Sequence, residues 1–404
     1  MDRRRFLLSG LAGMGVLLAS GRARAGGRGR KLLVYFNSGG WDPTFVFDPH
    51  FESTGVEGDP SSTAATVGGI AFADAASRPS VRRFFESYGA TTAVINGIGV
   101  SSISHSQCVR LILTGSRSSD AADLPSLLAA RIGTDLAMPY LVVSGPRYPG
   151  TLARYMVPLS HTLTATAQGT LPAGVQADPE HEALIRAFLL EESERLSGGD
   201  GDGLYGQYRD GLMRQDLLSG GGLSVPEDPT FDDDLASAIT ALSDGSSAAV
   251  MLQGDLPNLT TWDTHNDNQL KQDAAFEHTF DRLTDLIGRL ESTAGTDGQS
   301  LLSQTTVVVL SEMGRTPLYN GTFGKDHWPV TSAMLVGAGV AGGQVVGATD
   351  GGLSAARIDL ATGEATDSGE TLDISAVLAG LLTAFDVDPG DAFPGVTPLQ
   401  APIA

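Results

Sequence analysis

The stretch TTVVVLSEMGRTPLYNGTFGKDHWPVTSAMLV, residues 305–336, decides the fold. It opens with TTVVVLS and closes with SAMLV, two continuous apolar runs that are typical of strands buried on both faces of a sheet. Between these runs lie Glu312, Asp326 and His327, which are polar residues that a sheet tolerates at its edge rather than in its core. The stretch therefore predicts two core strands with chemically active side chains beside them.

Similar apolar runs recur along the chain, and amphipathic helices lie between them. The predicted strands are 31–37, 92–96, 139–143, 248–252, 305–311 and 332–336. In the segment 269–291, Phe276, Phe280 and Leu283 recur at helical spacing, and 374–385 is a second predicted helix. This alternation predicts an α/β fold with a doubly wound, mostly parallel sheet flanked by helices.

The composition of region 145–245 differs from that of the rest of the chain and predicts a helical cap or insertion. It contains two helical segments, 181–196 and 204–217, separated by Gly/Asp-rich turns such as SGGDGDG. Asp200 and Asp202 resemble a fragment of a calcium loop, but the acidic ligand that should close such a loop is missing. A solvated turn is the simpler interpretation.

The first 25 residues, MDRRRFLLSGLAGMGVLLASGRARA, predict an export signal. Arg3 and Arg4 precede Phe6, as in twin-arginine signals, and Ala23-Arg24-Ala25 is an A-x-A cleavage site. A Sec-type signal or a retained anchor is the alternative. The apolar run is too short to span a bilayer, so we expect residues 26–404 to be periplasmic or secreted, without stable membrane insertion. The partner in export would be the twin-arginine translocation machinery.

Charge and cysteine content exclude several classes of protein. The formal net charge of −21 on 404 residues disfavours nucleic acid and anionic lipid as partners. Cys108 is the only cysteine, which excludes disulfides and multi-thiolate zinc sites. It lies in the apolar stretch QCVRLIL, and we therefore interpret it as a core residue rather than a nucleophile.

Carboxylates and imidazoles gather where the predicted strands end. In open α/β sheets this edge binds ligands. The candidate ligands are Asp42, Asp263, His265, Glu312, Asp326 and His327. Such side chains hold divalent cations, and zinc, calcium and manganese all remain candidates. The chain has only three tryptophans, Trp41, Trp262 and Trp328, and each is adjacent to a candidate ligand, which favours one partly dry site. The alternative is that the acids cap loops or helices and that His327 is a core histidine.

The segment SISHSQCVRLILTGS, residues 102–116, predicts a helix that begins near Ser104, His105 or Ser106. The free amides and the dipole of a helix N-terminus favour an anion there. Capping residues of this composition are common, however, so this signal is weak alone.

The segments that carry the candidate ligands and the helix at 102–116, taken in their order along the chain, resemble the alkaline phosphatase and sulfatase superfamily. They resemble more closely its exported branch, called domain-of-unknown-function family 1501. The resemblance covers roughly residues 30–390 and weakens across 145–245. Its most specific part is SEMGRTPLYNGTFGKDHWPVTSAMLVGAGVAGGQVVGATD, residues 311–350. The resemblance implies an alkaline phosphatase-like fold.

The resemblance also implies roles for individual residues. His327, Asp263 and His265 would form one metal site, and Asp42 and Glu312 would form another with His105. His105 also falls in the nucleophile position of the superfamily. The sequence departs from the superfamily pattern at Met313, which cannot replace a hard ligand, and it has no C-x-P-x-R sulfatase motif.

Two functions follow as hypotheses. The first is a metal-dependent hydrolase of phosphate or sulfate esters, in which His105, Ser104 or a water would attack and Arg110 or Arg315 would bind the anion. Its partner would be a small anionic ester or a glycan. The alternative is a non-catalytic exported binding protein that keeps the fold and one structural metal. Phosphoryl transfer at the same site is a third possibility.

Overall fold

The core of the molecule is an eight-stranded sheet, seen in a computed structural model that describes residues 29–160, 179–197, 203–218, 226, 228–257 and 260–404. Its strand order is β12-β4-β11-β8-β1-β7-β5-β6. The strands are β1 (Lys31–Asn37), β4 (Thr92–Gly99), β5 (Tyr140–Val142), β6 (Met156–Pro158), β7 (Ala249–Gln253), β8 (Thr305–Ser311), β11 (Val330–Gly337) and β12 (Gln344–Val346). Only β11 runs antiparallel to its neighbours, β4 and β8. The predicted mostly parallel sheet is confirmed, and all six predicted strands are present.

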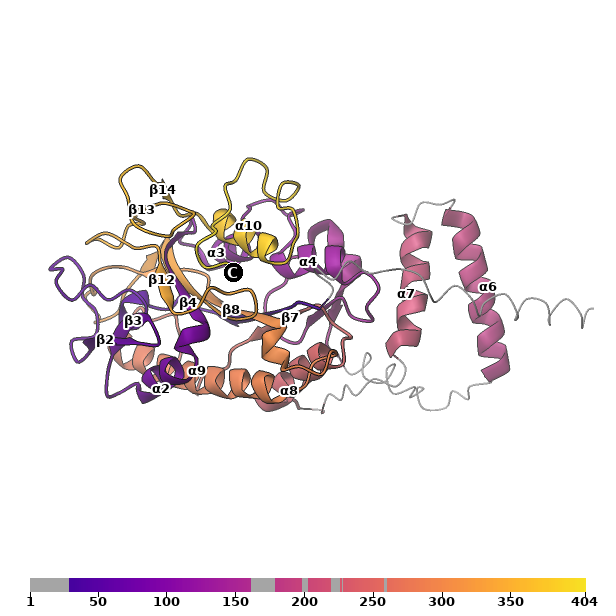
Figure 1. Cartoon of the computed structure of the whole chain (residues 1–404), viewed down its shortest axis with the longest axis horizontal. Helices are drawn as coiled ribbons and strands as arrows, with labels where there is room; N and C mark the ends of the chain where they lie inside the picture. The colour runs from indigo at the N-terminus through magenta and orange to yellow at the C-terminus, as the bar shows by residue number, and fades with distance from the viewer. Residues whose placement is uncertain (1–28, 161–178, 198–202, 219–225, 227, 258–259) are drawn as a thin grey trace, which may run out of the picture.

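Helices cover both faces of the sheet (Figure 1). One face carries α3 (His105–Thr114), α4 (Leu124–Ile132) and α10 (Ile374–Ala384), and the other carries α2 (Pro79–Tyr88), α8 (Phe231–Ser243) and α9 (Asn268–Ser292). The two core clusters reflect the two-residue period of a strand. In β1, Val34 faces the first layer whereas Leu33 and Tyr35 face the second.

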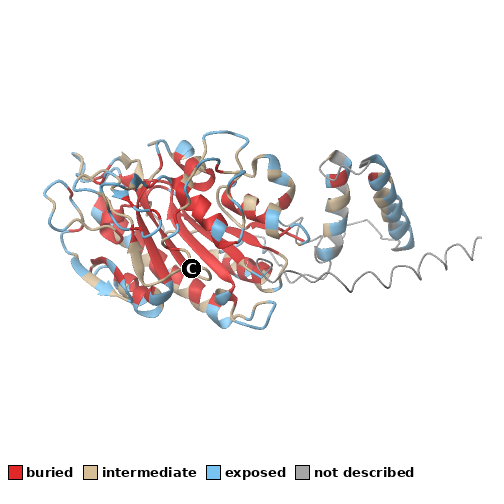
Figure 2. Cartoon of the chain, turned by 45° about the horizontal axis from the view of Figure 1, so that its top comes forward, coloured by how far each residue is buried: buried red, intermediate tan, exposed pale blue. Residues whose placement is uncertain are grey.

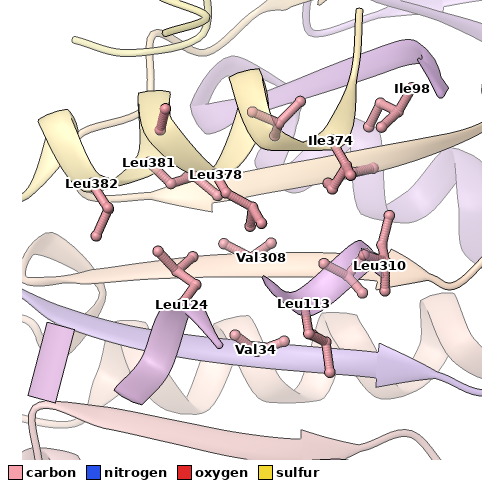
Figure 3. Close-up of a cluster of buried hydrophobic side chains, with 14 of the residues drawn as sticks. Val34, Ile98, Leu113, Leu124, Val308, Leu310, Ile374, Leu378, Leu381 and Leu382 are labelled. Carbon is pink, nitrogen blue, oxygen red and sulfur yellow. The ribbon is translucent and has the colours of Figure 1, made fainter. Parts of the chain in front are cut away.

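Burial explains why the strands were recognisable in the sequence. All seven residues of β1 and all seven of β8 are buried, so neither strand needs alternating polar positions (Figure 2). Val308 and Leu310 of β8 pack with Ile374, Leu378 and other residues of α10 in a buried apolar layer (Figure 3).

Smaller elements complete the fold. They are the hairpin of β2 (Thr63–Val67) and β3 (Ile70–Asp74), the pair β9 (Gly314–Arg315) and β10 (His327–Trp328), and the pair β13 (Arg357–Ile358) and β14 (Glu370–Thr371). The 3-10 turns are Pro43–Phe45, Gly89–Thr91, Gly150–Tyr155 and Leu301–Ser303. None of the helices in the described ranges is long and apolar enough to cross a membrane.

The predicted insertion at 145–245 divides into two parts. Its helices α6 (Pro179–Ser197) and α7 (Leu204–Leu218) pack on each other and stand beside the main body (Figure 1). In contrast, β6 joins the sheet and α8 buries Leu235 and Leu242 in the core. The part of 145–245 that stands apart from the sheet therefore consists of α6 and α7, whereas the composition of the sequence had suggested the whole range. Asp200, Asp202 and the export signal at 1–25 lie outside the described residues.

Candidate metal centre

The topology brings distant segments to one edge of the sheet. The parallel strands β1, β7 and β8 all end at this edge, followed by Gly39, Asp263 and Glu312 respectively. Because β11 is antiparallel to β8, its start also lies there, directly after His327 in β10. The helix α3 begins at His105, shortly after β4 ends at the same edge. This arrangement is the edge at which open α/β sheets bind ligands.

Three imidazoles meet one carboxylate at this edge. The Nε2 atoms of His265 and His327 lie 3.2 and 3.3 Å from Oδ1 of Asp263. The Nε2 atom of His105 lies 3.5 Å from Oδ2 of the same carboxylate. The two facing Nε2 atoms of His265 and His327 are 3.0 Å apart. Ligand atoms of His105, Asp263 and His327 all lie within 4.8 Å of one another. We call these four residues the histidine cluster.

Each imidazole is held through its other ring nitrogen. His105 Nδ1 lies 2.8 Å from Oε1 of Glu312, and His265 Nδ1 lies 2.7 Å from Oδ1 of Asp326. His327 Nδ1 lies 2.7 Å from the carbonyl oxygen of Ile103. Since all three partners are acceptors, Nδ1 carries the proton in each neutral ring. In the neutral rings, which are the form that binds a metal, the Nε2 lone pairs of all three histidines therefore face the carboxylate of Asp263.

This donor set fits a divalent cation. Two imidazole nitrogens 3.0 Å apart are stable only with a proton or a metal ion between them. In a tetrahedral site with bonds of about 2.0–2.1 Å, neighbouring ligand atoms are separated by about 3.3–3.4 Å. The three Nε2–Asp263 distances and the distance between His265 and His327, 3.0–3.5 Å, lie close to this value. Acceptors that orient ligating histidines are also typical of metal sites.

Arg315 fixes the carboxylate of the cluster. Its wholly buried guanidinium donates to Asp263 Oδ1 at 2.8 Å and to the carbonyl oxygens of Gly39, Gly40 and Lys325. Burial alone would raise the pKa of Asp263. The hydrogen bond and the charge of Arg315, followed by smaller contributions from His327 and His105, lower this pKa overall. Asp263 therefore stays ionised, as a ligand must.

Glu312 and Gly39 form the floor of the cluster. Glu312 is fully buried, and both of its carboxylate oxygens accept hydrogen bonds from the amide of Gly39. Gly39 has a φ of 128°, and a Cβ there would lie 2.9 Å from the backbone nitrogen of Asp263, so the close approach requires glycine. The hydrogen bond to Glu312 is the largest cause that raises the pKa of His105, against the effect of burial.

Asp42, a predicted ligand, lies in a different environment. Its Oδ2 pairs with the ammonium of Lys325 at 2.8 Å and accepts from Asn268 Nδ2 at 3.0 Å. Its Oδ1 accepts from the amide and the hydroxyl of Thr44. Both Asp42 and Lys325 are fully buried. Among the described residues, no hydrogen bond or ion pair joins the side chain of Asp42 to the histidine cluster. His105, which the resemblance groups with Asp42, lies against Asp263 instead.

The other predicted site residues are placed as follows. The hydroxyl of Ser104 lies 3.5 Å from that of Ser106. Arg110 stacks on the ring of Tyr148 at 4.5 Å and donates to the carbonyl of Ser118. The structure thus gathers His105, Asp263, His265, Glu312, Asp326, His327 and Arg315, whereas Asp42, Ser104 and Arg110 have other partners in the described chain.

Two of the three tryptophans pack in the hydrophobic core next to the loops that carry the site residues. Trp41 and Trp262 are almost completely buried and pack edge to face at 6.1 Å, and both contact Phe276 in the core. Trp328 donates its indole N–H to the carbonyl of Leu353. The predicted proximity of tryptophans and ligands is present, but these rings belong to the packing rather than to a pocket wall. Sequence analysis did not anticipate the buried partner of Asp42, Lys325, although Lys325 is one of only three lysines and directly precedes Asp326.

Comparisons with known proteins agree with the resemblance over part of the chain. Residues 240–374 match the family described as "Protein of unknown function (DUF1501)", so the predicted resemblance to that family is confirmed across Asp263, His265, Glu312, Asp326 and His327. No curated protein matches the chain significantly in sequence.

Solved structures that are similar to this chain share 10% identity with it. They include a protein of the alkaline phosphatase superfamily from Vibrio parahaemolyticus, with a TM-score of 0.41, covering 94% of this chain and 72% of that one. The lipoteichoic acid synthase LtaP from Listeria monocytogenes has a TM-score of 0.38, covering 92% and 73%. The sulfatase PsFucS1 from a Pseudoalteromonas species has a TM-score of 0.34, covering 89% and 68%.

Proposed function

We propose that this protein is an exported, metal-dependent hydrolase of phosphate or sulfate esters, with one divalent ion held by the histidine cluster. The observation that carries the proposal is the convergence of three Nε2 lone pairs on the carboxylate of Asp263. A divalent ion in such a site supplies Lewis-acid activation of an ester oxygen or of a water molecule.

Hydrogen bonds within the protein orient the ligand side chains of this site in the absence of an ion. Glu312 and Asp326 hold the Nδ1 protons of His105 and His265, so that Nε2 is the free ligand atom in each ring. Arg315 keeps Asp263 ionised and oriented. The cluster is therefore preorganised, which reduces the cost of ordering ligands when the ion binds.

An ester can reach the cluster from solvent. The side chains of His105, Asp263 and His265 are 37%, 38% and 44% exposed. The net charge of −21 repels an anionic ester at long range, so the bound cation would provide the local attraction. We therefore expect association with an anionic ester to become faster as ionic strength rises, because salt screens the repulsion.

A second candidate function is a non-catalytic binding protein with one structural metal. It is favoured because both arginines that were predicted to bind the anion interact with other groups of the protein instead. Arg315 is wholly buried and donates to four oxygen atoms of the protein, and Arg110 stacks on Tyr148. In this alternative, the ion would hold together the three segments that carry His105, Asp263 with His265, and His327, rather than activate an ester.

Export through the twin-arginine route is part of the proposal and rests on residues 1–25. The route carries folded proteins, so the ion would be inserted before transport. The test is cell fractionation of the full chain and of the Arg3→Lys, Arg4→Lys double variant. We expect the processed protein in the periplasm or medium only with both arginines; equal export of the variant would contradict the proposal.

The decisive experiment measures metal content and ester turnover in the same preparations. The exported protein is assayed on aryl phosphate, phosphodiester and aryl sulfate esters, with and without chelator. His327→Ala and Asp263→Ala are compared with His278→Ala, a histidine that pairs with Asp255 outside the cluster. One equivalent of metal and chelator-sensitive turnover, both lost only in the two cluster variants, would support the hydrolase. One equivalent without turnover would favour the binding protein, and no bound metal would overturn both.

A further inference from the structure

A cavity of about 510 Å³ lies beside the loop that joins β9 to β10, apart from the histidine cluster. Its wall comes from the loop after the first 3-10 turn, from the start of α9 and from the β9–β10 loop, and includes Phe51, Glu57, Asp59, Gln269 and Tyr319. The volume lies within the range of about 300–1,000 Å³ that is usual for small-molecule sites.

The charges of this wall are mostly compensated. Asp59 is buried and pairs with the buried guanidinium of Arg78 at 2.8 Å. Asp59 also accepts from Gln269 Nε2 at 3.2 Å. Glu57 is exposed and accepts from the amide of Tyr319 through Oε2. His50 also lines the cavity, but its Nε2 lies 3.7 Å from the carboxylate of Asp48, so an acid of the protein already faces it. Among the described residues, Glu57 is therefore the carboxylate of the wall without a cationic partner, and its charge disfavours anionic ligands.

The remaining wall is amphipathic. Phe51 is 45% exposed at the cavity, and Tyr319 contributes a second aromatic ring. Burial, and then the nearby Asp42, raise the pKa of Tyr319 well above its usual value, so its hydroxyl remains a neutral donor and acceptor. Thr44 and Ser62 also line the cavity. The hydroxyls of Thr44, Ser62 and Tyr319 donate to Asp42, Asp59 and Gly58 respectively. A purely apolar ligand would strip water from the carboxylate of Glu57 without replacing its hydrogen bonds, which costs binding energy.

We propose that this cavity binds a neutral sugar. The C–H face of a pyranose ring fits against aromatic side chains, here those of Phe51 and Tyr319. The hydroxyls of the sugar can donate to the carboxylate of Glu57 and to the phenol oxygen of Tyr319, whose own hydroxyl proton points to the carbonyl of Gly58 at 3.4 Å. A neutral polyol thus matches both the apolar and the polar parts of the wall, whereas an anion meets the charge of Glu57.

The cavity is linked to the histidine cluster by one loop. Next to Tyr319, Asn320 donates from Nδ2 to the backbone carbonyl of His265 at 3.1 Å. The same loop ends at Asp326, which holds His265 Nδ1. A sugar in the cavity would therefore contact the loop that positions a cluster histidine. Sugar binding itself requires no metal, so it can be tested separately from the proposed function.

Titration calorimetry of the exported protein, with and without chelator, tests this inference. The probes are glucose, galactose, N-acetylglucosamine and cellobiose, with glucose 6-phosphate and glucosamine as charged comparators. We expect at least one neutral sugar to bind with a Kd on the order of 1 mM or tighter, and glucose 6-phosphate to bind at least about tenfold more weakly. Chelator should leave the affinity for the neutral sugar unchanged.

Variants locate the binding. Tyr319→Leu and Glu57→Gln should each weaken sugar binding at least about tenfold, and Glu57→Gln should partly restore binding of glucose 6-phosphate. Phe323→Leu is the matched control, because Phe323 is a 76% exposed aromatic residue of the same loop outside the cavity wall. Circular dichroism and metal content establish that each variant is folded. Absence of binding by every neutral sugar, unchanged binding in both cavity variants, or a preference for glucosamine would overturn the inference.

Discussion

The Nδ1 nitrogen of His105 lies 2.8 Å from Oε1 of Glu312, a carboxylate that is fully buried. The backbone amide of Gly39 donates to both oxygens of this carboxylate, so the acceptor that orients His105 is itself fixed by the chain after β1. Three segments that are distant in sequence are joined by this contact. It gives Glu312 a positioning role, since it acts on the cluster through His105.

We predict that Glu312→Gln weakens metal binding by about 10- to 100-fold, the usual cost of altering an outer partner of a ligating histidine. The amide keeps the shape of the side chain but removes the charge that favours the Nδ1 proton. The readout is the metal Kd from competition with a chelator. Rescue by Glu312→Asp is not expected, because the shorter side chain cannot reach both Gly39 and His105.

Glu86→Gln is the control for this substitution, because Glu86 is an exposed glutamate of α2 that is distant from the cluster in the fold. Metal affinity equal to that of the unmodified protein in both variants would show that Glu312 does not position His105. A loss of folding in Glu312→Gln would appear in circular dichroism and separates a structural effect from a positioning one.

Much of the fold was predictable because buried strands and helices have characteristic patterns of hydrophobic residues in the sequence. Strands β1 and β8 are buried on both faces, so they appear as continuous apolar runs. The long helix α9 buries one face that includes Phe276, Phe280 and Leu283, which produces a clear helical period. In contrast, β2 and β6 are short or exposed, so no comparable pattern distinguishes them from loops.

The sequence indicated most of the side chains that gather at this edge, but it also included Asp42, Ser104 and Arg110, and it did not indicate which residues pair with one another. Strand ends indicated which acids and histidines meet at the edge of the sheet, as Asp263 and Glu312 do. Which carboxylate faces a cation of the protein depends on side-chain directions in loops, and no periodic pattern encodes these directions. For this reason Asp42 resembled a metal ligand in sequence, and its partner Lys325 was not anticipated.

The thiol of Cys108 should be unreactive in the native protein. Cys108 is completely buried in the core on α3, and burial raises the pKa of the thiol, which keeps it protonated. We expect a thiol reagent such as dithiobis-nitrobenzoate to modify about one thiol per chain in denaturant and almost none without it. Rapid modification of the native protein would contradict the assignment of Cys108 to the core.

His50 should make stability depend on pH. The interaction with Asp48 is the largest cause that raises the pKa of His50 above 6.5, and His50 Nε2 also lies 2.7 Å from the hydroxyl of Thr349. A raised folded-state pKa stabilises the fold below the unfolded value of about 6.5, and this contribution is lost as pH rises through the folded-state pKa.

The His50 contribution can be isolated by comparing His50→Asn with the unmodified protein in urea unfolding at pH 5.5 and pH 8.5. We expect the variant to be less stable by a larger margin at pH 5.5 than at pH 8.5. His181→Asn controls for the general effect of replacing a histidine. An equal difference at the two pH values would show that protonation of His50 does not stabilise the fold.

The ion pair between Asp42 and Lys325 should be indispensable for stability unless both charges are removed. Both side chains are fully buried and 2.8 Å apart, so Lys325→Met leaves an unpaired carboxylate in the core. We expect this variant to lose about 3–5 kcal/mol of unfolding free energy in urea titrations, and Asp42→Asn combined with Lys325→Met to recover most of that loss, because removing both charges is far less costly. Metal content should remain one equivalent in both variants, because the side chains of Asp42 and Lys325 pair with each other and not with the histidine cluster. If Lys325→Met instead kept full stability and took up a second equivalent of metal, Asp42 would be a ligand after all, and the protein would carry a two-metal site.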